Sequence, residues 1–305
     1  MTPGDRQRQR QGLGFLLPWL VGFLFFSVYP LVASLWFSLC DYSVLAPPVF
    51  LGTKNFTDMA QDPVFWQALR NTLLFASAAI PLGTALSIGL AVLLNQPIRA
   101  RGFFRTVFFL PSLVPVISLA ILWQWVLNGQ MGLLNTLLAY PLRWVGEILG
   151  TSCPPPDWLN DPLFAQWGLV FTGLWGTGHA VVIYLAGLQE IPAELYEAAE
   201  LDGTNAWQRF WHVTLPLLSP VIFFNVIMGV IGTLQTFAVP FILTGGGDGP
   251  GRSLLFIATY IYQHAFRYWN MGYACSLALF LFALIALLTY WVVRLGETRV
   301  HYAGR

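Results

Sequence analysis

Five carboxylates are concentrated in one short stretch of a chain that carries little charge elsewhere. Only 10% of the 305 residues are charged, yet five of the 14 acids fall within thirteen residues, namely Glu190, Glu194, Glu197, Glu200 and Asp202. Apolar stretches flank this acidic cluster on both sides. Acids in this setting can face a partner protein outside a bilayer, or they can solvate a loop that only connects two membrane spans. Composition alone leaves both interpretations open.

Motifs for other chemistry are missing from the sequence. A phosphate-binding loop needs G-x-x-x-x-G-K-[ST], whose lysine reaches the phosphates, and the chain's only lysine, Lys54, stands in LGTKNF. Neither H-E-x-x-H nor G-x-S-x-G occurs, and the cysteines show no metal-ligand spacing. The histidines are far apart in sequence, at His179, His212, His264 and His301. A membrane-embedded enzyme is therefore a remote alternative, and any ATP must be hydrolysed by another chain.

The composition is that of an integral membrane protein. Hydrophobic residues make up 56% of the chain and its mean hydropathy is +0.63, whereas soluble domains average about 45–50% apolar and about 25% charged residues. The net charge of +1 provides no field to attract nucleic acid. The elements that position the acidic cluster must therefore be membrane helices.

Six stretches are long enough to cross a bilayer, which takes about 20 mainly apolar residues. They are Leu13–Leu39, Asn71–Leu94, Thr106–Leu127, Leu163–Leu188, Leu217–Leu243 and Gly272–Val293. Two further apolar stretches are expected to be interfacial or re-entrant: Leu254–Phe266 is too short, and Gly132–Leu149 is broken by Pro141. The predicted fold is an all-α integral membrane protein with six transmembrane helices in residues 13–296.

Basic residues predict the orientation. With six spans, one side of the membrane holds both termini, residues 95–105 and residues 189–216, and it carries ten of the 15 basic residues. Cytoplasmic loops are enriched in lysine and arginine, so the tails at 1–12 and 297–305 and the acidic cluster are predicted to be cytoplasmic. The first apolar run exceeds the roughly 7–15 residues of a signal-peptide core, which favours an uncleaved first span.

The acidic cluster is predicted to form two short helices around a hinge. Pro192 suits a first helical turn, and Ala193–Asp202 consists of good helix formers. Gly203 stands where a C-cap glycine belongs, and Asn205, with a glutamine three residues on, can cap a second helix. Pro216 is expected to close that helix before the fifth span.

The residues of this loop resemble the EAA motif of binding-protein-dependent ABC importer permeases. The sequence EAAELDG, followed by LP, supplies Glu197, Ala198, Ala199, Asp202, Gly203, Leu215 and Pro216. The segments LAGLQEIPAELY (Leu185–Tyr196) and FILTGGG (Phe241–Gly247) look like the sugar-transporter branch of that family, and the resemblance covers essentially the whole chain. Thr204 departs from the usual alanine, and GGGDGP carries an inserted aspartate and glycine.

The resemblance implies that residues 189–216, hereafter the coupling loop, dock in a cleft of a cytoplasmic ATPase subunit. Glu197 would form a salt bridge to that subunit, and Gly203 would provide the turn that fits the cleft. ATP and Mg²⁺ would be held by the ATPase, and this chain would bind no cofactor. The other implied partners are a second permease subunit and an extracytoplasmic substrate-binding protein, in the cytoplasmic (inner) membrane of a bacterium or archaeon.

Few polar side chains lie within the predicted spans, which makes them candidates for a solute pathway. We expect Trp175, His179, Thr233 and Thr236 to face a shared cavity, although ordinary helix packing is an alternative. No lysine or arginine lies deep in a span, so hydroxyls, amides and aromatic rings favour a small neutral carbohydrate. A glycerol-phosphate-type or other polyol substrate remains the alternative.

Overall fold

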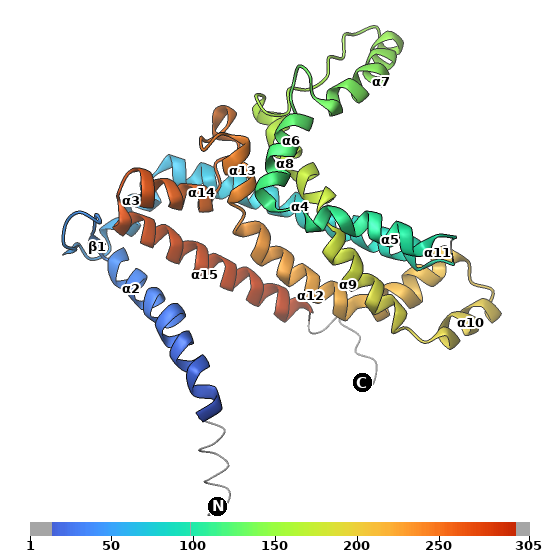
Figure 1. The fold of residues 1–305 in the computed structure, drawn as a ribbon, viewed down its shortest axis with the longest axis horizontal. Coiled ribbons are helices and arrows are strands. Elements are labelled where there is room, and N and C mark those ends of the chain that lie inside the picture. The colour runs from blue at the N-terminus through green and yellow to red at the C-terminus, as the bar shows by residue number, and fades with distance from the viewer. Residues whose placement is uncertain (1–13, 98, 297–305) are drawn as a thin grey trace, which may run out of the picture. The chain divides into compact units, whose positions relative to one another are not determined.

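The computed structural model describes residues 14–97 and 99–296 (Figure 1), and nearly all regular structure in them is helical. The chain divides into two compact units. Unit 1 contains the residues up to Pro63 together with Tyr260–Phe282, and unit 2 contains Val64–Thr259 and the residues from Ala283 onward.

Unit 1 begins with one long helical run, Gly14–Ser38. The run contains a π-helical turn, η1 (Leu24–Val28), which leads directly into α2 (Tyr29–Ser38). Pro30 lacks an N–H and its ring crowds the carbonyl of residue 26, so the wider turn lies where the regular hydrogen-bond ladder is broken. A short antiparallel hairpin, β1 (Cys40–Asp41) with β2 (Val49–Phe50), and α3 (Lys54–Gln61) follow.

A buried polar cluster links the two segments of unit 1, the residues up to Pro63 and Tyr260–Phe282. The Asp62 carboxylate accepts hydrogen bonds from the phenols of Tyr260 (2.5 Å) and Tyr273 (2.8 Å). Burial, together with the bond to Asp62, raises the pKa of Tyr260 above its ordinary value. The His264 ring packs against both tyrosines, and burial lowers its pKa although Asp62 opposes the shift. This cluster joins the end of α3 to η5 (Gln263–Arg267) and the start of α15.

The remaining helices form unit 2 or run across the boundary between the units. They are α4 (Pro63–Asn95), α5 (Arg101–Phe109), η2 (Leu110–Leu113), α6 (Val116–Val126), α7 (Leu133–Leu149), α8 (Pro162–Trp175), α9 (Gly178–Gln189), α10 (Ala193–Leu201), α11 (Ala206–Arg209), η3 (Phe210–Thr214), α12 (Leu215–Leu234), α13 (Ala238–Leu243), η4 (Pro250–Arg252), α14 (Ile257–Tyr262) and α15 (Met271–Gly296).

Four helical runs are long and apolar enough to cross a membrane, and they correspond to the predicted first, second, fifth and sixth spans, although Leu13 of the first lies outside the described residues. They are Gly14–Ser38, Pro63–Asn95, Ala206–Leu243 and Met271–Gly296. The third and fourth predicted spans are bent pairs: Arg101–Leu113 with Val116–Val126 at 98°, and Pro162–Trp175 with Gly178–Gln189 at 47°. By length and composition, six spans result if each bent pair counts as one.

Proline and glycine explain where these helices bend. Val114 precedes Pro115 and adopts ψ 126°, because a residue before proline is forced out of the helical region. The break between α12 and α13 lies at the residues preceding Pro240, whose ring would clash with the carbonyl of Thr236. Gly178 starts α9 in close contact with α5, since a Cβ there would lie 2.7 Å from the carbonyl oxygen of Phe108.

The two additional apolar stretches are not among the helices that could span a membrane in the described residues. Residues 254–266 contain only the six-residue α14 and the start of η5. The expected break at Pro141 is wrong, because α7 continues through this proline for all 17 residues. Helices tolerate an internal proline when the freed backbone groups find other partners.

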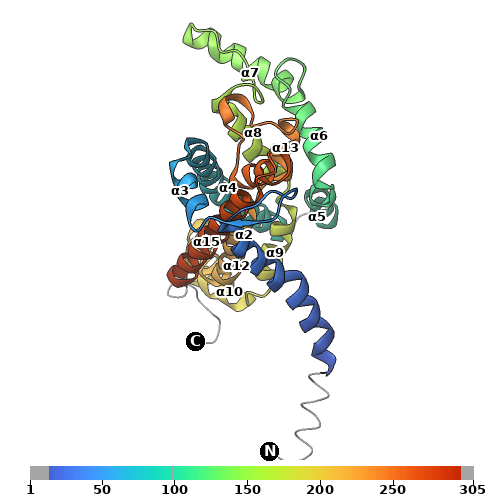
Figure 2. The same cartoon turned by 90° about the vertical axis from the view of Figure 1, so that its left-hand side faces the viewer.

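Two buried clusters hold unit 2 together. One joins α4, α9 and α12 around Tyr184 and Leu218, both fully buried. The other joins α4, α8 and α13 around Phe75, whose ring packs edge-on against Phe256 at a centroid distance of 5.4 Å. Figures 1 and 2 show α10 and α7 at opposite ends of unit 2, so the coupling loop and residues 133–149 lie far apart.

Candidate functional site

The hinge of the coupling loop is a glycine-capped helix end. Gly203 has φ +77°, the left-handed conformation that glycine adopts without a steric penalty. Its N–H donates to the carbonyl of Glu200, and the N–H of Thr204 donates to Ala199, which is the bond pattern of a Schellman cap. The Thr204 hydroxyl donates to the same Ala199 carbonyl at 2.6 Å. The threonine that departs from the family pattern thus adds a bond to the turn.

The second helix of the loop is joined to the membrane helix that follows. Asn205 and Gln208 form a complete capping box, as the sequence predicts. α11 then passes through the π-helical η3 into α12 without a break. The expectation that Pro216 closes this helix is wrong, because Pro216 lies in the first turn of α12, where its missing N–H does not interrupt the run.

Two side-chain contacts join α10 to η3 and the helix before it. The Tyr196 hydroxyl lies 3.1 Å from the Thr214 hydroxyl, and Thr214 is buried. Glu200 forms an ion pair with Arg209. One of the five acids therefore also contacts the loop itself, although its side chain is 62% exposed. These two contacts tie α10 to the turns that lead into α12.

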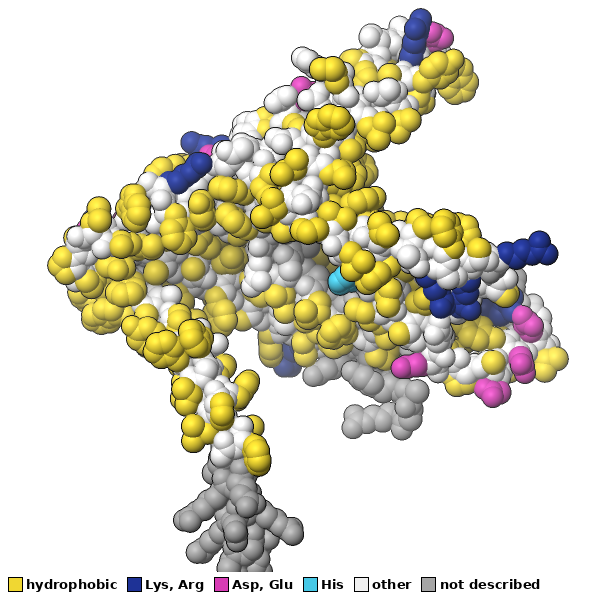
Figure 3. Space-filling view, in the orientation of Figure 1, with side chains coloured by type: hydrophobic (Ala, Val, Ile, Leu, Met, Phe, Trp, Pro, Cys, Tyr) yellow, Lys and Arg dark blue, Asp and Glu magenta, His cyan; other side chains and the backbone are white. Residues whose placement is uncertain are grey.

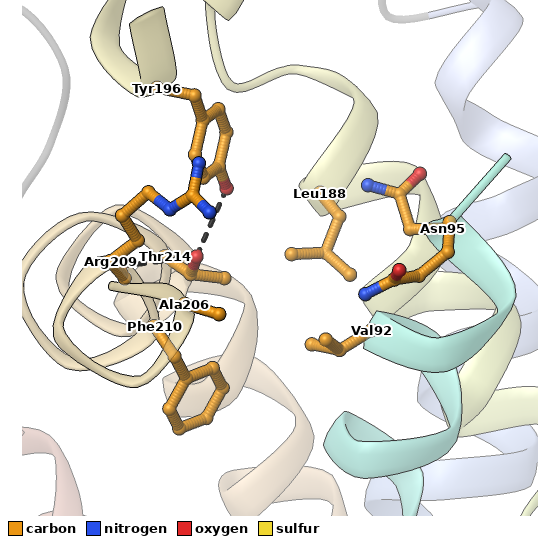
Figure 4. A pocket seen from close by; sticks show the side chains of 9 residues that line it. Val92, Asn95, Leu188, Tyr196, Ala206, Arg209, Phe210 and Thr214 are labelled. Carbon is orange, nitrogen blue, oxygen red and sulfur yellow. Dashed lines mark hydrogen bonds between the residues drawn. The ribbon is translucent and has the colours of Figure 1, made fainter. Parts of the chain in front are cut away.

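A cavity of about 330 Å³ lies behind these contacts (Figure 4). One side is formed by the coupling loop, including Tyr196 and Thr214. Val92 and Asn95 at the end of α4 and Leu188 at the end of α9 form the other side. The loop is thus supported at its two side-chain contacts and has open space next to them.

The outer surface of the loop combines acids with exposed apolar side chains, of which Leu201 protrudes furthest. Glu197, Asp202 and Gly203 are exposed, and so is Ala198. Leu201 is 90% exposed, the highest exposed fraction among the large apolar side chains of the loop, ahead of Trp207 at 69%. Acidic side chains gather over α10 and basic ones near the start of α5 (Figure 3). Sequence reasoning overlooked Leu201, although its place between Glu200 and Asp202 could have indicated an apolar anchor.

The motif residues at the other end of the loop are placed differently. Leu215 and Pro216 are half-buried at the start of α12. Ala199 is half-buried and its carbonyl accepts both bonds from Thr204. The structure thus separates an exposed tip, made by residues 197, 198 and 201–203, from a base in which the loop joins α12.

Thr233 and Thr236 line a cavity of about 290 Å³ between α4, α8 and α12. Their hydroxyls donate to the backbone carbonyls of Gly229 (2.7 Å) and Gly232 (3.3 Å), one helical turn earlier. A hydroxyl oxygen that donates within its own helix keeps acceptor capacity for a ligand. Thr172 and Thr177 line the same cavity.

Trp175 lines a different and larger cavity of about 640 Å³. It packs edge-on against Trp123 at a centroid distance of 6.1 Å, and Trp158 lines the same cavity. Leu174 and Thr177 line both cavities, so the two are neighbours. His179 is exposed at the start of α9 and stacks on Phe109 at 5.4 Å. Thr233 and Thr236 therefore share one cavity, Trp175 lines the neighbouring one, and His179 lines neither.

The Tyr196–Thr214 contact leads to a first testable prediction. Tyr196→Phe removes one hydroxyl and keeps the ring, so we expect solute uptake to fall by a factor of about 2 to 13, the equivalent of one neutral hydrogen bond. ATP hydrolysis by the complex should continue, because the loop surface is unchanged. Uptake and hydrolysis should be measured on the same preparation. The matched control is Tyr140→Phe, at an 87% exposed tyrosine on α7, and an equal loss there would contradict the prediction.

Within the described residues, no three His, Cys, Asp or Glu side chains are placed to hold a metal ion. The coupling loop presents carboxylates and apolar side chains, and the two cavities present hydroxyls and indoles.

Comparisons with known proteins identify the family. The sequence profile of the family described as "Binding-protein-dependent transport system inner membrane component" matches residues 83–302. The chain is 35% identical to the probable ABC transporter permease protein YesP of Bacillus subtilis, over 98% of this chain and 94% of that protein. It is 36% identical to the lactose transport system permease protein LacF of Rhizobium radiobacter, over 90% of each.

A third relative has a similar sequence, and a solved structure has a similar fold. The trehalose/maltose transport system permease protein MalF of Thermococcus litoralis is 34% identical over 94% of both chains. A chain from the crystal structure of a bacterial ABC transporter that imports the acidic polysaccharide alginate has the same fold, with a TM-score of 0.81, 22% identity, and 97% and 98% of the two chains covered. The chain therefore belongs to the binding-protein-dependent inner membrane component family and is a transport subunit, the permease of an ABC importer.

Proposed function

We propose that this permease subunit carries a neutral sugar or oligosaccharide and forms half of the pathway together with a second permease subunit. Separate ATPase subunits bind the coupling loop from the cytoplasm, where both termini also lie. An extracytoplasmic substrate-binding protein delivers the solute. A solved transporter of the same fold was crystallised with its solute-bound periplasmic protein, which supports this last partner.

The observation that carries the coupling role is the exposed tip of the loop. Leu201 is 90% exposed and acids lie on either side of it, while the base is fixed to α12 through Tyr196 and Thr214. An apolar anchor surrounded by charge suits a cleft in another protein, because burying a leucine contributes about 1.5–3 kcal/mol. The fixed base lets movement of the bound partner reach a membrane helix.

The two cavities of unit 2 support a carbohydrate. Threonine hydroxyls line one and three tryptophans line the other, and such groups bind sugars through hydrogen bonds and ring faces. Among the described residues lining them there is no lysine or arginine, which disfavours a polyol phosphate. Relatives named for lactose and for trehalose/maltose transport add to this argument.

ATP-dependent uptake in vesicles tests the proposal. The chain should be purified together with its ATPase and second permease, reconstituted, and supplied with its substrate-binding protein. We expect uptake of labelled neutral oligosaccharides that requires ATP, and little uptake of a sugar phosphate of equal size. Preferred uptake of the phosphate would favour the alternative substrate class, and ATP-independent movement of either would contradict an ABC importer.

Orientation can be tested by cysteine labelling. Arg252→Cys and Arg267→Cys place thiols at two exposed positions on either side of residues 254–266, in a background with Cys153 replaced by serine. Ser253 is too buried to serve as a probe. Because α14 is too short to span, both thiols should react with an impermeant reagent added outside. Labelling of only one would show that this segment crosses the membrane.

A further inference from the structure

Arg105 on α5 is a cationic side chain without a partner among the described residues. Its Nε and Nη2 atoms are covered by protein and make no hydrogen bond there. The side chain borders a cavity of about 260 Å³ between α5 and α9. A guanidinium carries five donors in a fixed fork, and covered donors that remain unsatisfied are costly. The position therefore calls for an acceptor that this part of the chain does not supply.

Arg101, on the same helix, is an arginine whose hydrogen-bond donors do have partners. Arg101, one helical turn earlier, donates from Nε to the carbonyl of Leu94 at 2.8 Å and from Nη2 to Oδ1 of Asn95 at 2.8 Å. It thereby caps the end of α4, where carbonyls lack helical partners. Arg105 has no such bond within the described residues, so the structural role of Arg101 does not extend to it.

The lining of the cavity describes the missing acceptor. Besides Arg105 it contains one amide, Gln189, and otherwise glycine and apolar residues, namely Leu94, Phe109, Gly178, Val181, Val182, Leu185 and Ala186. No carboxylate is among these described lining residues. Val182, Ala186 and Gln189 are exposed, so the cavity opens at the side of α9. A guanidinium beside an open apolar groove matches a ligand with an anionic head and a hydrocarbon chain.

From this geometry we infer that the cavity between α5 and α9 binds the phosphodiester headgroup of an anionic phospholipid, with Arg105 as its cation and the apolar face of α9 against an acyl chain. The inference rests on the proposed orientation, in which residues 95–105 face the cytoplasm, where anionic lipids attract basic groups. Gln189 ends α9 and is the first residue of the coupling loop. The bound lipid would therefore lie beside the helix that leads into that loop.

Native mass spectrometry of the purified transporter complex tests this site. Phosphatidylglycerol, a neutral diacyl glycolipid that has equal acyl chains and no phosphate, and inorganic phosphate are titrated separately. We expect one phosphatidylglycerol to bind about tenfold more tightly than the glycolipid, as one charge-assisted hydrogen bond to the phosphodiester implies. Arg105→Gln should remove this preference, whereas Arg105→Lys should keep part of it. The matched control is Arg99→Gln, at an exposed arginine six residues earlier, which should leave the preference unchanged.

Ala186→Phe gives an independent readout, because it fills the opening of the cavity and keeps the charge. Ala186→Phe should abolish the preference for phosphatidylglycerol, and this test remains possible even if the Arg105→Gln variant does not assemble into the transporter complex. Equal binding of both lipids would overturn the inference by showing that the phosphodiester is not recognised, and an equal effect of Arg99→Gln would overturn it by showing diffuse attraction. Binding of inorganic phosphate alone would overturn the lipid as its source. Loss of the second permease in Arg105→Gln with lipid binding intact would assign Arg105 to a carboxylate of that subunit. Cysteine labelling tests the orientation separately, so the two failures are distinguishable.

Discussion

Leu201→Asp is expected to abolish transport by releasing the ATPase, while the membrane helices stay folded. The side chain is 90% exposed, so its replacement costs the isolated chain little. In the complex the loss of a buried leucine, worth about 1.5–3 kcal/mol, adds to the cost of desolvating a carboxylate. Association should therefore weaken roughly a hundredfold or more. Co-purification of the ATPase and uptake by the same vesicles measure this effect.

The control for Leu201 is another leucine of the same exposure. Leu45→Asp changes an 87% exposed leucine in the loop between β1 and β2, which is predicted to lie outside the cell. It should leave ATPase binding unchanged, and Leu201→Met should retain most of it. Normal ATPase binding by Leu201→Asp would show that the protruding leucine is not an anchor.

Glu197→Lys and Gly203→Asp extend the same test to the motif residues. Glu197 is exposed, so reversing its charge should act on a basic partner and not on the fold. A Cβ added at Gly203 would meet no atom of the described chain within 4 Å, so any steric conflict of an aspartate must come from the partner, apart from strain at its positive φ. Wild-type uptake by both variants would reduce the loop to a connector.

The membrane helices could be predicted because their signal is local. Length and apolar composition are properties of a stretch, and the runs around residues 14–38, 63–95 and 271–296 follow from them. The 98° bend does not follow, although Pro111 and Pro115 lie within the third predicted span. Prolines tell where a helix can break, but Pro141 and Pro115 differ in outcome, because neighbouring elements decide whether the freed groups find partners.

The loop shows the same limit at the level of side chains. The Gly203 cap and the Asn205 capping box are encoded within a few residues, and both predictions are confirmed. The pairing of Glu200 with Arg209 and the contact between Tyr196 and Thr214 depend on how α10 folds back on η3. No spacing rule reports such a return, so sequence reasoning counts Glu200 among the acids available to a partner.

Trp175→Ala is expected to reduce uptake by about tenfold and to alter the choice among sugars. Trp175 is half exposed on the wall of the larger of the two cavities and meets Trp123 edge-on. Its removal deletes a ring face whose burial against a sugar involves a large contact area. Thr236→Val deletes one hydroxyl from the neighbouring cavity and should cost a factor of about 2 to 13. Thr233→Val should resemble it, and His179→Phe reports on the ring stacked against Phe109.

Measuring the abundance of each variant distinguishes residues that line the solute pathway from residues that only pack helices together. Trp167→Ala is the matched control, because Trp167 lies on the same helix α8, is 45% exposed and lines neither cavity. It should leave uptake per transporter unchanged. Competition among neutral sugars is the decisive measurement, since a residue that only packs helices changes the number of working transporters and not their preference. If all four substitutions lower uptake only in proportion to lost protein and the order of competing sugars stays the same, these side chains belong to helix packing, and the solute passes elsewhere.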